Sequence, residues 1–165
     1  MARVDITEEK RDVIPAIGPK QKPTLIKLFG KNLNAHKKQL YCVIGVEWVI
    51  ASHITAHSLE CVAPKSTFAG VVKVRVATED GEYLPGHANF EYIDDPLIFD
   101  AQPSRVTDGA DVLLIGRGFK RFDSLICMIG DFEGRALILD DTRVVCTVPE
   151  LAGDGTYSIT VDTNG

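Results

Sequence analysis

The sequence has no apolar run near the ~18 residues that a membrane helix needs, and it contains no Asn-x-Ser/Thr glycosylation site. Basic residues are not in excess: 18 Lys and Arg stand against 23 Asp and Glu, a net charge of −5. This balance argues against a nucleic-acid partner, because binding phosphates requires positive charge. The opening MARVDITEEKRD lacks the apolar centre of a signal peptide, so any secretion signal is expected outside this sequence.

What the sequence does contain is an internal repeat. Two segments match in order at spacings of 85 or 86 residues. The matched positions are Gly30, Cys42, Gly45, Cys61, Pro64 and Gly70 in the first segment and Gly116, Cys127, Gly130, Cys146, Pro149 and Gly155 in the second. The repeat predicts two domains, residues 12–93 and 94–165, joined at the dipeptide before Pro96.

Apolar residues alternate with polar ones within each repeat, as in half-buried strands. The fold class predicted is all-β, with two tandem immunoglobulin-like sandwiches. The expected cores are Ile26, Leu28, Ile44, Val72, Val74 and Val76 in the first repeat and Val112, Leu114, Ile129, Tyr157, Ile159 and Val161 in the second. Trp48 is expected to be partly buried. The second repeat stops at the position of Gly81, so its last strand is expected to be missing from this sequence.

The order of strand glycine, Cys-x-x-Gly, Cys-x-x-Pro and a final alternating strand, occurring twice, resembles the IPT/TIG family. Members of that family occur in plexins, in growth-factor receptor ectodomains, in Rel-type transcription factors and as spacers in starch-acting enzymes. The resemblance covers residues 12–93 fully and 94–165 almost fully. It implies immunoglobulin-like sandwiches that bind and do not catalyse.

The resemblance also implies one disulfide in each repeat, Cys42 with Cys61 and Cys127 with Cys146, as in cell-surface members of the family. Four cysteines allow three connectivities, and only this one keeps each bridge within a repeat. Disulfides would place the parent protein in an oxidising, extracellular compartment. Four buried free thiols in a cytosolic protein are the alternative.

No catalytic residue, metal site or cofactor is predicted. His53 and His57 have the spacing of a helical metal site, but the segment reads as strand and turn. The candidate binding surface consists of apolar residues expected on the outer side of strands, with neighbouring lysines: Leu25, Phe29, Leu113, Ile115, Lys27 and Lys31. A strand that is apolar on both faces is usually covered on both. Cover by a loop of the chain itself is the alternative.

The function predicted is a non-catalytic extracellular recognition or adhesion module, a fragment of a larger multi-repeat surface or secreted protein. Its expected partners are a protein ligand, with a glycan as the alternative, and neighbouring repeats of the parent chain. Two alternatives are an intracellular domain of the transcription-factor type and a spacer domain of an enzyme. The acidic charge balance weighs against the first.

Residues 1–11 are either a leader or the remnant last strand of a preceding repeat. At an offset of 86, residues 2–9 match residues 88–95 in their alanine, their alternation and their closing acidic pair. We therefore expect a strand over residues 2–7, with the alternation needed to pair with an open edge of the second repeat.

Overall fold

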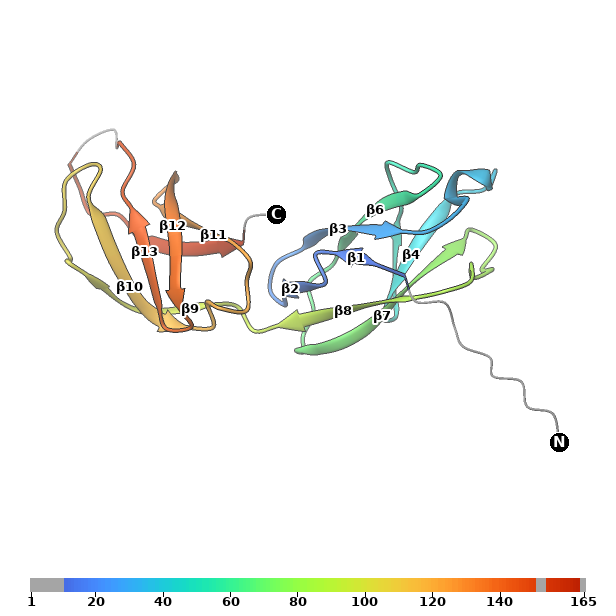
Figure 1. Cartoon of the computed structure of the whole chain (residues 1–165), viewed down its shortest axis with the longest axis horizontal. Helices are drawn as coiled ribbons and strands as arrows, with labels where there is room; N and C mark the ends of the chain where they lie inside the picture. Colours follow the sequence, from blue (N-terminus) through green and yellow to red (C-terminus); the bar gives the residue numbers. More distant parts are fainter. Residues whose placement is uncertain (1–10, 151–153, 164–165) are drawn as a thin grey trace. The chain divides into compact units, whose positions relative to one another are not determined.

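The computed structural model describes residues 11–150 and 154–163, and its regular structure is almost entirely β (Figure 1). The chain divides into two compact units between Ile93 and Asp94. Among the described residues there is one short 3₁₀ turn, η1 (Leu33–Ala35), and no α-helix. The predicted fold class of two tandem immunoglobulin-like units is confirmed.

The first unit contains two sheets, with strand orders β1-β3-β6 and β2-β8-β7-β4-β5 (Figure 1). All pairs are antiparallel except β2 with β8. The strands are β1 (Val13–Ile14), β2 (Ile17–Pro19), β3 (Thr24–Phe29), β4 (Leu40–Ile44), β5 (Glu47–Ile50), β6 (Ser58–Ala63), β7 (Gly70–Thr78) and β8 (Ala88–Ile93).

The core of the first unit lies between its two sheets and follows the alternation of the strands. Of the residues predicted there, Val72 is half-buried and the others are buried: Ile26, Leu28, Ile44, Val74 and Val76. Strand β8 adds Phe90 and Tyr92, whose rings meet edge to face with centroids 5.1 Å apart. The Tyr92 hydroxyl donates a hydrogen bond to the Pro64 carbonyl, so its polar end is satisfied.

The described part of the second unit forms one sheet in the order β14-β11-β12-β13-β10-β9. The strands are β9 (Leu97–Gln102), β10 (Asp111–Arg117), β11 (Leu125–Ile129), β12 (Phe132–Asp140), β13 (Arg143–Thr147) and β14 (Ile159–Thr163). Strand β12 pairs with β11 at its beginning and with β13 at its end, so it connects the two halves of the sandwich. In the first unit the equivalent β5 is short, and only an isolated bridge, Ser52 to Glu60, makes that connection.

Strands β7 and β14 occupy equivalent places, because Val76 lies opposite Cys42 and Val161 lies opposite Cys127. Val76 is buried, whereas Val161 is half-buried; the predicted core residues Tyr157 and Ile159 are half-buried too. Strand β7 is flanked by β4 and β8, whereas β14 pairs with β11 alone among the described strands. The described residues thus contain no counterpart of β8, which would cover this part of the second core. The strand expected over residues 2–7 lies outside them.

Candidate binding surface

The outer face of β3 and β6 carries an exposed apolar pair in the first repeat. Leu25 lies directly opposite Val62, and the two side chains are 48% and 49% exposed. The neighbouring buried residues, Ile26 opposite Cys61, point the other way, into the core. The structure thus places Leu25 on the outer side of the sheet, where it was expected, and adds Val62 beside it.

Lys27 and Phe29 follow Leu25 on the same outer face. Lys27 is opposite Glu60, and its Nζ lies 5.7 Å from the centroid of the half-buried Phe29 ring. An ammonium over a ring face at this distance is held by the ring's negative electrostatic potential. Leu25, Lys27 and Phe29 therefore form one short row with two apolar ends and a charged centre.

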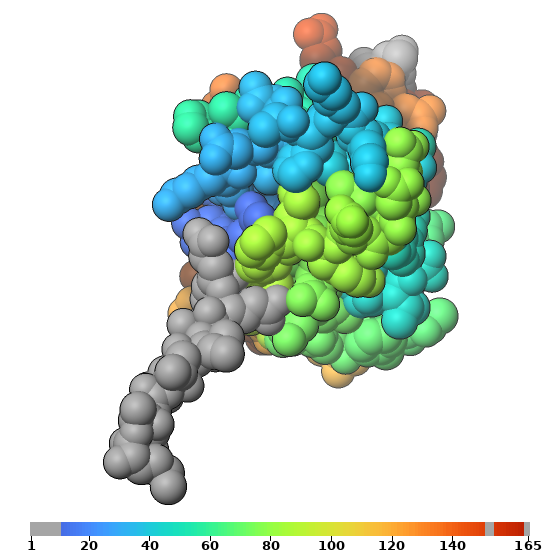
Figure 2. Space-filling view, turned by 90° about the vertical axis from the view of Figure 1, so that its right-hand side faces the viewer, coloured from blue at the N-terminus to red at the C-terminus, as the bar shows by residue number. Residues whose placement is uncertain are grey.

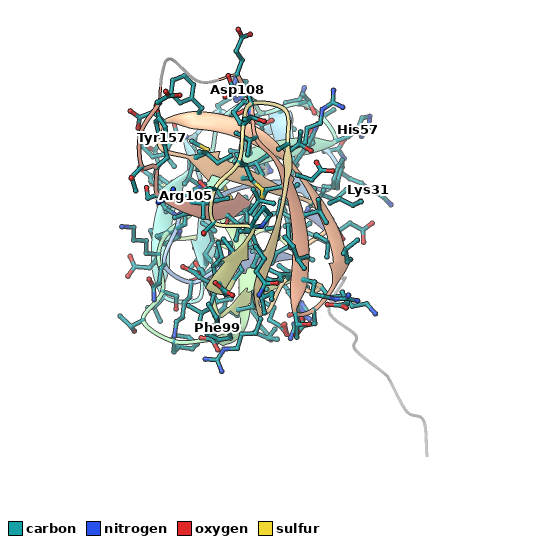
Figure 3. The ribbon with its side chains drawn as sticks, turned by 90° about the vertical axis from the view of Figure 1, so that its left-hand side faces the viewer. Lys31, His57, Phe99, Arg105, Asp108 and Tyr157 are labelled. Atoms are coloured by element: carbon teal, nitrogen blue, oxygen red, sulfur yellow. A yellow bond between two sulfur atoms is a disulfide. The ribbon has the colours of Figure 1, made fainter. Side chains whose placement is uncertain are left out.

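Lys31 lies beyond the end of β3 and is exposed (Figure 3). The segment with His57 lies beside it, because the Gly30 amide donates a hydrogen bond to the His57 carbonyl at 2.9 Å (Figure 3). Lys22 precedes β3, so the six-residue strand holds it roughly 20 Å from Lys31. Lys22 and Lys31 thus lie beyond opposite ends of the strand, and Lys27 lies between them.

Figure 2 shows part of the first repeat, where residues 31–40 and 79–87 lie side by side. The Glu79 amide donates to the Gln39 carbonyl at 3.0 Å, and Lys38 forms an ion pair with Asp80. This pair raises the pKa of Lys38 above its ordinary value. Lys38 therefore stays protonated, and the Asp80 carboxylate balances its charge.

In the second repeat an apolar row crosses three strands. Leu113 on β10 lies opposite Val145 on β13, which in turn lies opposite Leu137 on β12. Leu137 is 63% exposed, and the other two are half-buried. The flanking β13 residues Val144 and Cys146 are buried, so the row faces outward. The predicted Leu113 is thus the inner end of a larger surface.

Ile115, the other predicted residue of this repeat, lies two positions further along β10 and is half-buried. It is opposite Arg143 on β13 and Asp100 on β9. Leu139 on β12 is 47% exposed, at an irregularity in the pairing of β12 with β13. Ile115 therefore lies next to charged residues, whereas Leu113 lies in the apolar row.

A charged turn borders this apolar row. The Asp140 carboxylate accepts hydrogen bonds from the Thr142 amide at 2.9 Å and from Arg143 Nε at 2.8 Å. The Arg143 guanidinium, followed by the Thr142 donors, lowers the pKa of Asp140 to about 2. The carboxylate is therefore ionised at all but strongly acidic pH and fixes the turn between β12 and β13.

An aromatic cluster, which the sequence did not predict, covers part of the outer face of β4, β5 and β7. The Trp48 ring centroid lies 5.8 Å from that of Tyr41 and 6.2 Å from that of Tyr83. The Arg75 guanidinium lies 4.7 Å from the Tyr83 ring centroid. Trp48 is 45% exposed and lies outside the core. Aromatic and arginine side chains are enriched in protein interfaces.

The structure contains one disulfide within each repeat, Cys42–Cys61 and Cys127–Cys146, the pairing that the resemblance implied. The Cα–Cα distances are 6.4 Å and 6.0 Å. All four residues are buried. Each bond joins the two sides of its sandwich at the centre of the core.

The two histidines with metal-site spacing lie in an irregular segment. His53 has a positive φ of 48°, and its Nδ1 is 2.9 Å from Oε2 of Glu60. His57 is exposed in the same turn. Within residues 11–150 and 154–163, no group of three or more His, Cys, Asp or Glu could hold a metal ion. The same residues include no helix long and apolar enough to cross a membrane.

The IPT/TIG domain family matches this chain twice, at residues 11–92 and 96–165. The chain belongs to the IPT/TIG family. Each match corresponds to one structural unit with its disulfide, so the architecture is that of two consecutive IPT/TIG domains.

Two solved structures of the plexin A4 extracellular region resemble these IPT/TIG domains. They are 21% and 18% identical over 90% and 92% of the chain, with TM-scores of 0.69 and 0.62. The chain spans only 13% and 16% of their lengths. A protein of the Bacteroides ovatus mixed-linkage glucan utilization locus, solved in complex with a mixed-linkage heptasaccharide, is 20% identical over 91% of this chain and 38% of its own, at a TM-score of 0.41. The plexin likeness supports the fold.

Proposed function

We propose that this chain is a non-catalytic recognition module of a larger extracellular protein, and that it binds a protein ligand through the outer faces of its strands. The observation that carries this proposal is the exposure of apolar side chains on the outer faces of both repeats. Leu25 and Val62 provide them in the first repeat, and Leu137, Val145 and Leu113 in the second.

Burial of these side chains supplies the free energy for such a contact. Removing apolar area from water contributes roughly 25 cal/mol per Å². The charged residues beside the apolar groups, Lys27 in the first repeat and Arg143 in the second, would form the polar rim that such interfaces have. Rim charges contribute mainly to specificity and association rate.

The two disulfides support an extracellular location. A bond buried in each core persists in an oxidising compartment, whereas cytosolic thiols are kept reduced. Expression through the secretory pathway should yield a protein without reactive thiols, measured as an unchanged mass after alkylation without reductant. A cytosolic preparation should take up label at all four cysteines after unfolding.

Binding can be tested with the chain biotinylated at its N-terminus and assembled into tetramers on labelled streptavidin. Staining of intact cells should be lost after trypsin treatment and retained after enzymatic removal of glycans. Val62→Ser and Leu137→Ser should each weaken staining by about tenfold. Val71→Ser is the matched control, because Val71 is 62% exposed but lies on β7, outside the proposed surface.

Two outcomes would contradict the proposal. Staining that resists trypsin but disappears with the glycans would make the ligand a glycan. Staining that both surface variants retain would place the contact elsewhere on the chain. Far-UV circular dichroism of each variant would show that the β structure is intact.

A further inference from the structure

Six strands of the described chain are sheet edges with a ladder partner on one side only: β1, β6, β2, β5, β14 and β9. An edge exposes backbone donors and acceptors, and proteins usually protect it with prolines or charges. Five edges have such protection, supplied by Pro15 after β1, Pro64 after β6, Pro19 in β2, Asp162 in β14 and Asp100 in β9. Strand β5 has no proline, and its one charged residue is Glu47 at its first position.

The segment Val46-Glu-Trp-Val-Ile50 has no proline and no basic residue. Its one charge, Glu47, is at the first position of β5. Val46 is 89% exposed, Ile50 64% and Trp48 45%. A segment of β-branched and aromatic residues has high strand propensity. Beyond Glu47 this edge is therefore apolar and prone to pairing.

The backbone geometry shows which groups the edge offers. The Ala51 amide donates to the Leu40 carbonyl on β4 at 3.0 Å. In an antiparallel ladder alternate residues direct their N–H and C=O groups to opposite sides. Trp48 and Ile50 therefore direct theirs away from β4. Ser52, next in this series, pairs with Glu60 on β6.

The aromatic cluster fixes the side chain beside this edge. Trp48 is held between Tyr41 and Tyr83, and Arg75 packs on the Tyr83 ring. Trp48 lies directly opposite Val43 on β4, and Val43 is buried. The Trp48 side chain is therefore packed against its neighbours on the outer face of the sheet. A side chain that is already ordered loses less conformational entropy when a partner binds.

We propose that β5 is the contact through which two copies of this chain associate, by antiparallel pairing of their β5 strands. Two identical antiparallel strands are related by a two-fold axis, so each contact is made twice. With Val49 opposite the partner's Val49, Trp48 lies opposite the partner's Ile50 and Glu47 opposite the partner's Ala51. Apolar residues then face each other and no like charges meet, which makes the strand complementary to itself.

The size of this contact makes the dimer weak. A four-residue strand with one flanking aromatic cluster offers less area than the roughly 1,200–2,000 Å² of a stable interface. Association is therefore concentration-dependent in solution, and it gains when copies are held close together, as in a surface array.

Sedimentation equilibrium of the intact, oxidised chain from about 10 µM to about 1 mM tests the proposal. Monomer should convert to dimer across this range. Trp48 is the only tryptophan, so its emission should shift to shorter wavelength, and its quenching by acrylamide should fall, in parallel with the dimer fraction. Ile50→Lys should weaken the dimer by about tenfold or more, because it places a charge on the edge.

Val71→Lys is the matched control, because Val71 is as exposed as Ile50 and lies on an interior strand of the same sheet. It should leave the dissociation constant unchanged. A chain that stays monomeric with constant Trp48 emission up to the highest concentration would overturn the proposal. A dimer that Ile50→Lys does not weaken, or that Val71→Lys weakens equally, would place the contact away from β5.

Discussion

Where the first repeat pairs Leu25 with Val62, the second pairs Asp111 with Thr147, whose hydroxyl donates to the Asp111 carboxylate at 2.9 Å. Two residues along, the first repeat has the charged pair of Lys27 and Glu60, whereas the second has Leu113 and Val145. Apolar and polar pairs have thus exchanged places on equivalent outer faces. The chain offers two different surfaces on one framework.

The inner faces show the opposite behaviour. Ile26 lies opposite Cys61 and Val112 lies opposite Cys146, in the same register and with all four residues buried. Core positions are restricted because each side chain must fill a fixed volume around the disulfide. Outer positions carry no such restriction, so they are free to acquire separate partners.

Removal of either disulfide should have the largest effect on the stability of the two repeats. Cys42→Ala with Cys61→Ala, or Cys127→Ala with Cys146→Ala, should lower the unfolding free energy of the repeat concerned by about 3 kcal/mol. The effects should be similar, because both pairs are 19 residues apart in sequence. Trp48 fluorescence during guanidinium unfolding reports on the first repeat alone, and circular dichroism reports on both.

The variant of the second repeat is its own control in this measurement. It should shift the circular dichroism transition while the Trp48 transition stays in place. If both transitions moved together, the two repeats would unfold as one cooperative unit. The stability of each core would then depend on the other repeat.

The equivalent glycines Gly30 and Gly116 distinguish the repeats with a smaller expected effect. A Cβ on Gly116 would overlap the backbone carbonyl oxygen of Leu97, whereas a Cβ on Gly30 would meet the end of the Arg11 side chain. Backbone cannot move aside as a long side chain can. Gly116→Ala should therefore cost about 1–3 kcal/mol, and Gly30→Ala clearly less, by guanidinium unfolding. Equal costs would show that β9 yields as readily as Arg11.

The sequence predicted the inner face around the cysteines, because the two repeats match one another there and the strands around them alternate. Tyr157, Ile159 and Val161, predicted for the core of the second repeat, are only half-buried. It predicted the outer face only in part. Leu113 was found by its alternation, but Leu137 and Val145 come from other strands, and single-strand patterns do not show which strands are neighbours. In β5, Trp48 and Ile50 point to one face of the sheet and Val49 points to the other. All three are apolar, so the alternation did not indicate which face is exposed to solvent.

The turns before β6 and β13 are equivalent and are held by different chemistry. In the first repeat the Thr55 hydroxyl accepts hydrogen bonds from the amides of His57 and Ser58, at 3.2 Å and 3.0 Å. In the second, the Asp140 carboxylate accepts from Thr142 and Arg143. Of the two equivalent acceptors, Thr55 and Asp140, only Asp140 is ionisable, so acid should weaken these hydrogen bonds in the second repeat and not in the first.

The smallest predicted effect follows from this difference. The pKa of Asp140 falls on folding from its ordinary value of 3.8 to about 2. A depressed folded-state pKa stabilises the protein above the unfolded value, and this contribution is lost as the pH falls from about 4 to about 2. Asp140→Asn should therefore slightly lower the melting temperature at pH 7 and have a much smaller effect at pH 2. Thr55→Val, the neutral counterpart, should cost the same at both pH values in circular dichroism melts. If the Asp140→Asn difference persisted undiminished at pH 2, the turn would be held by hydrogen-bond geometry and not by the carboxylate charge.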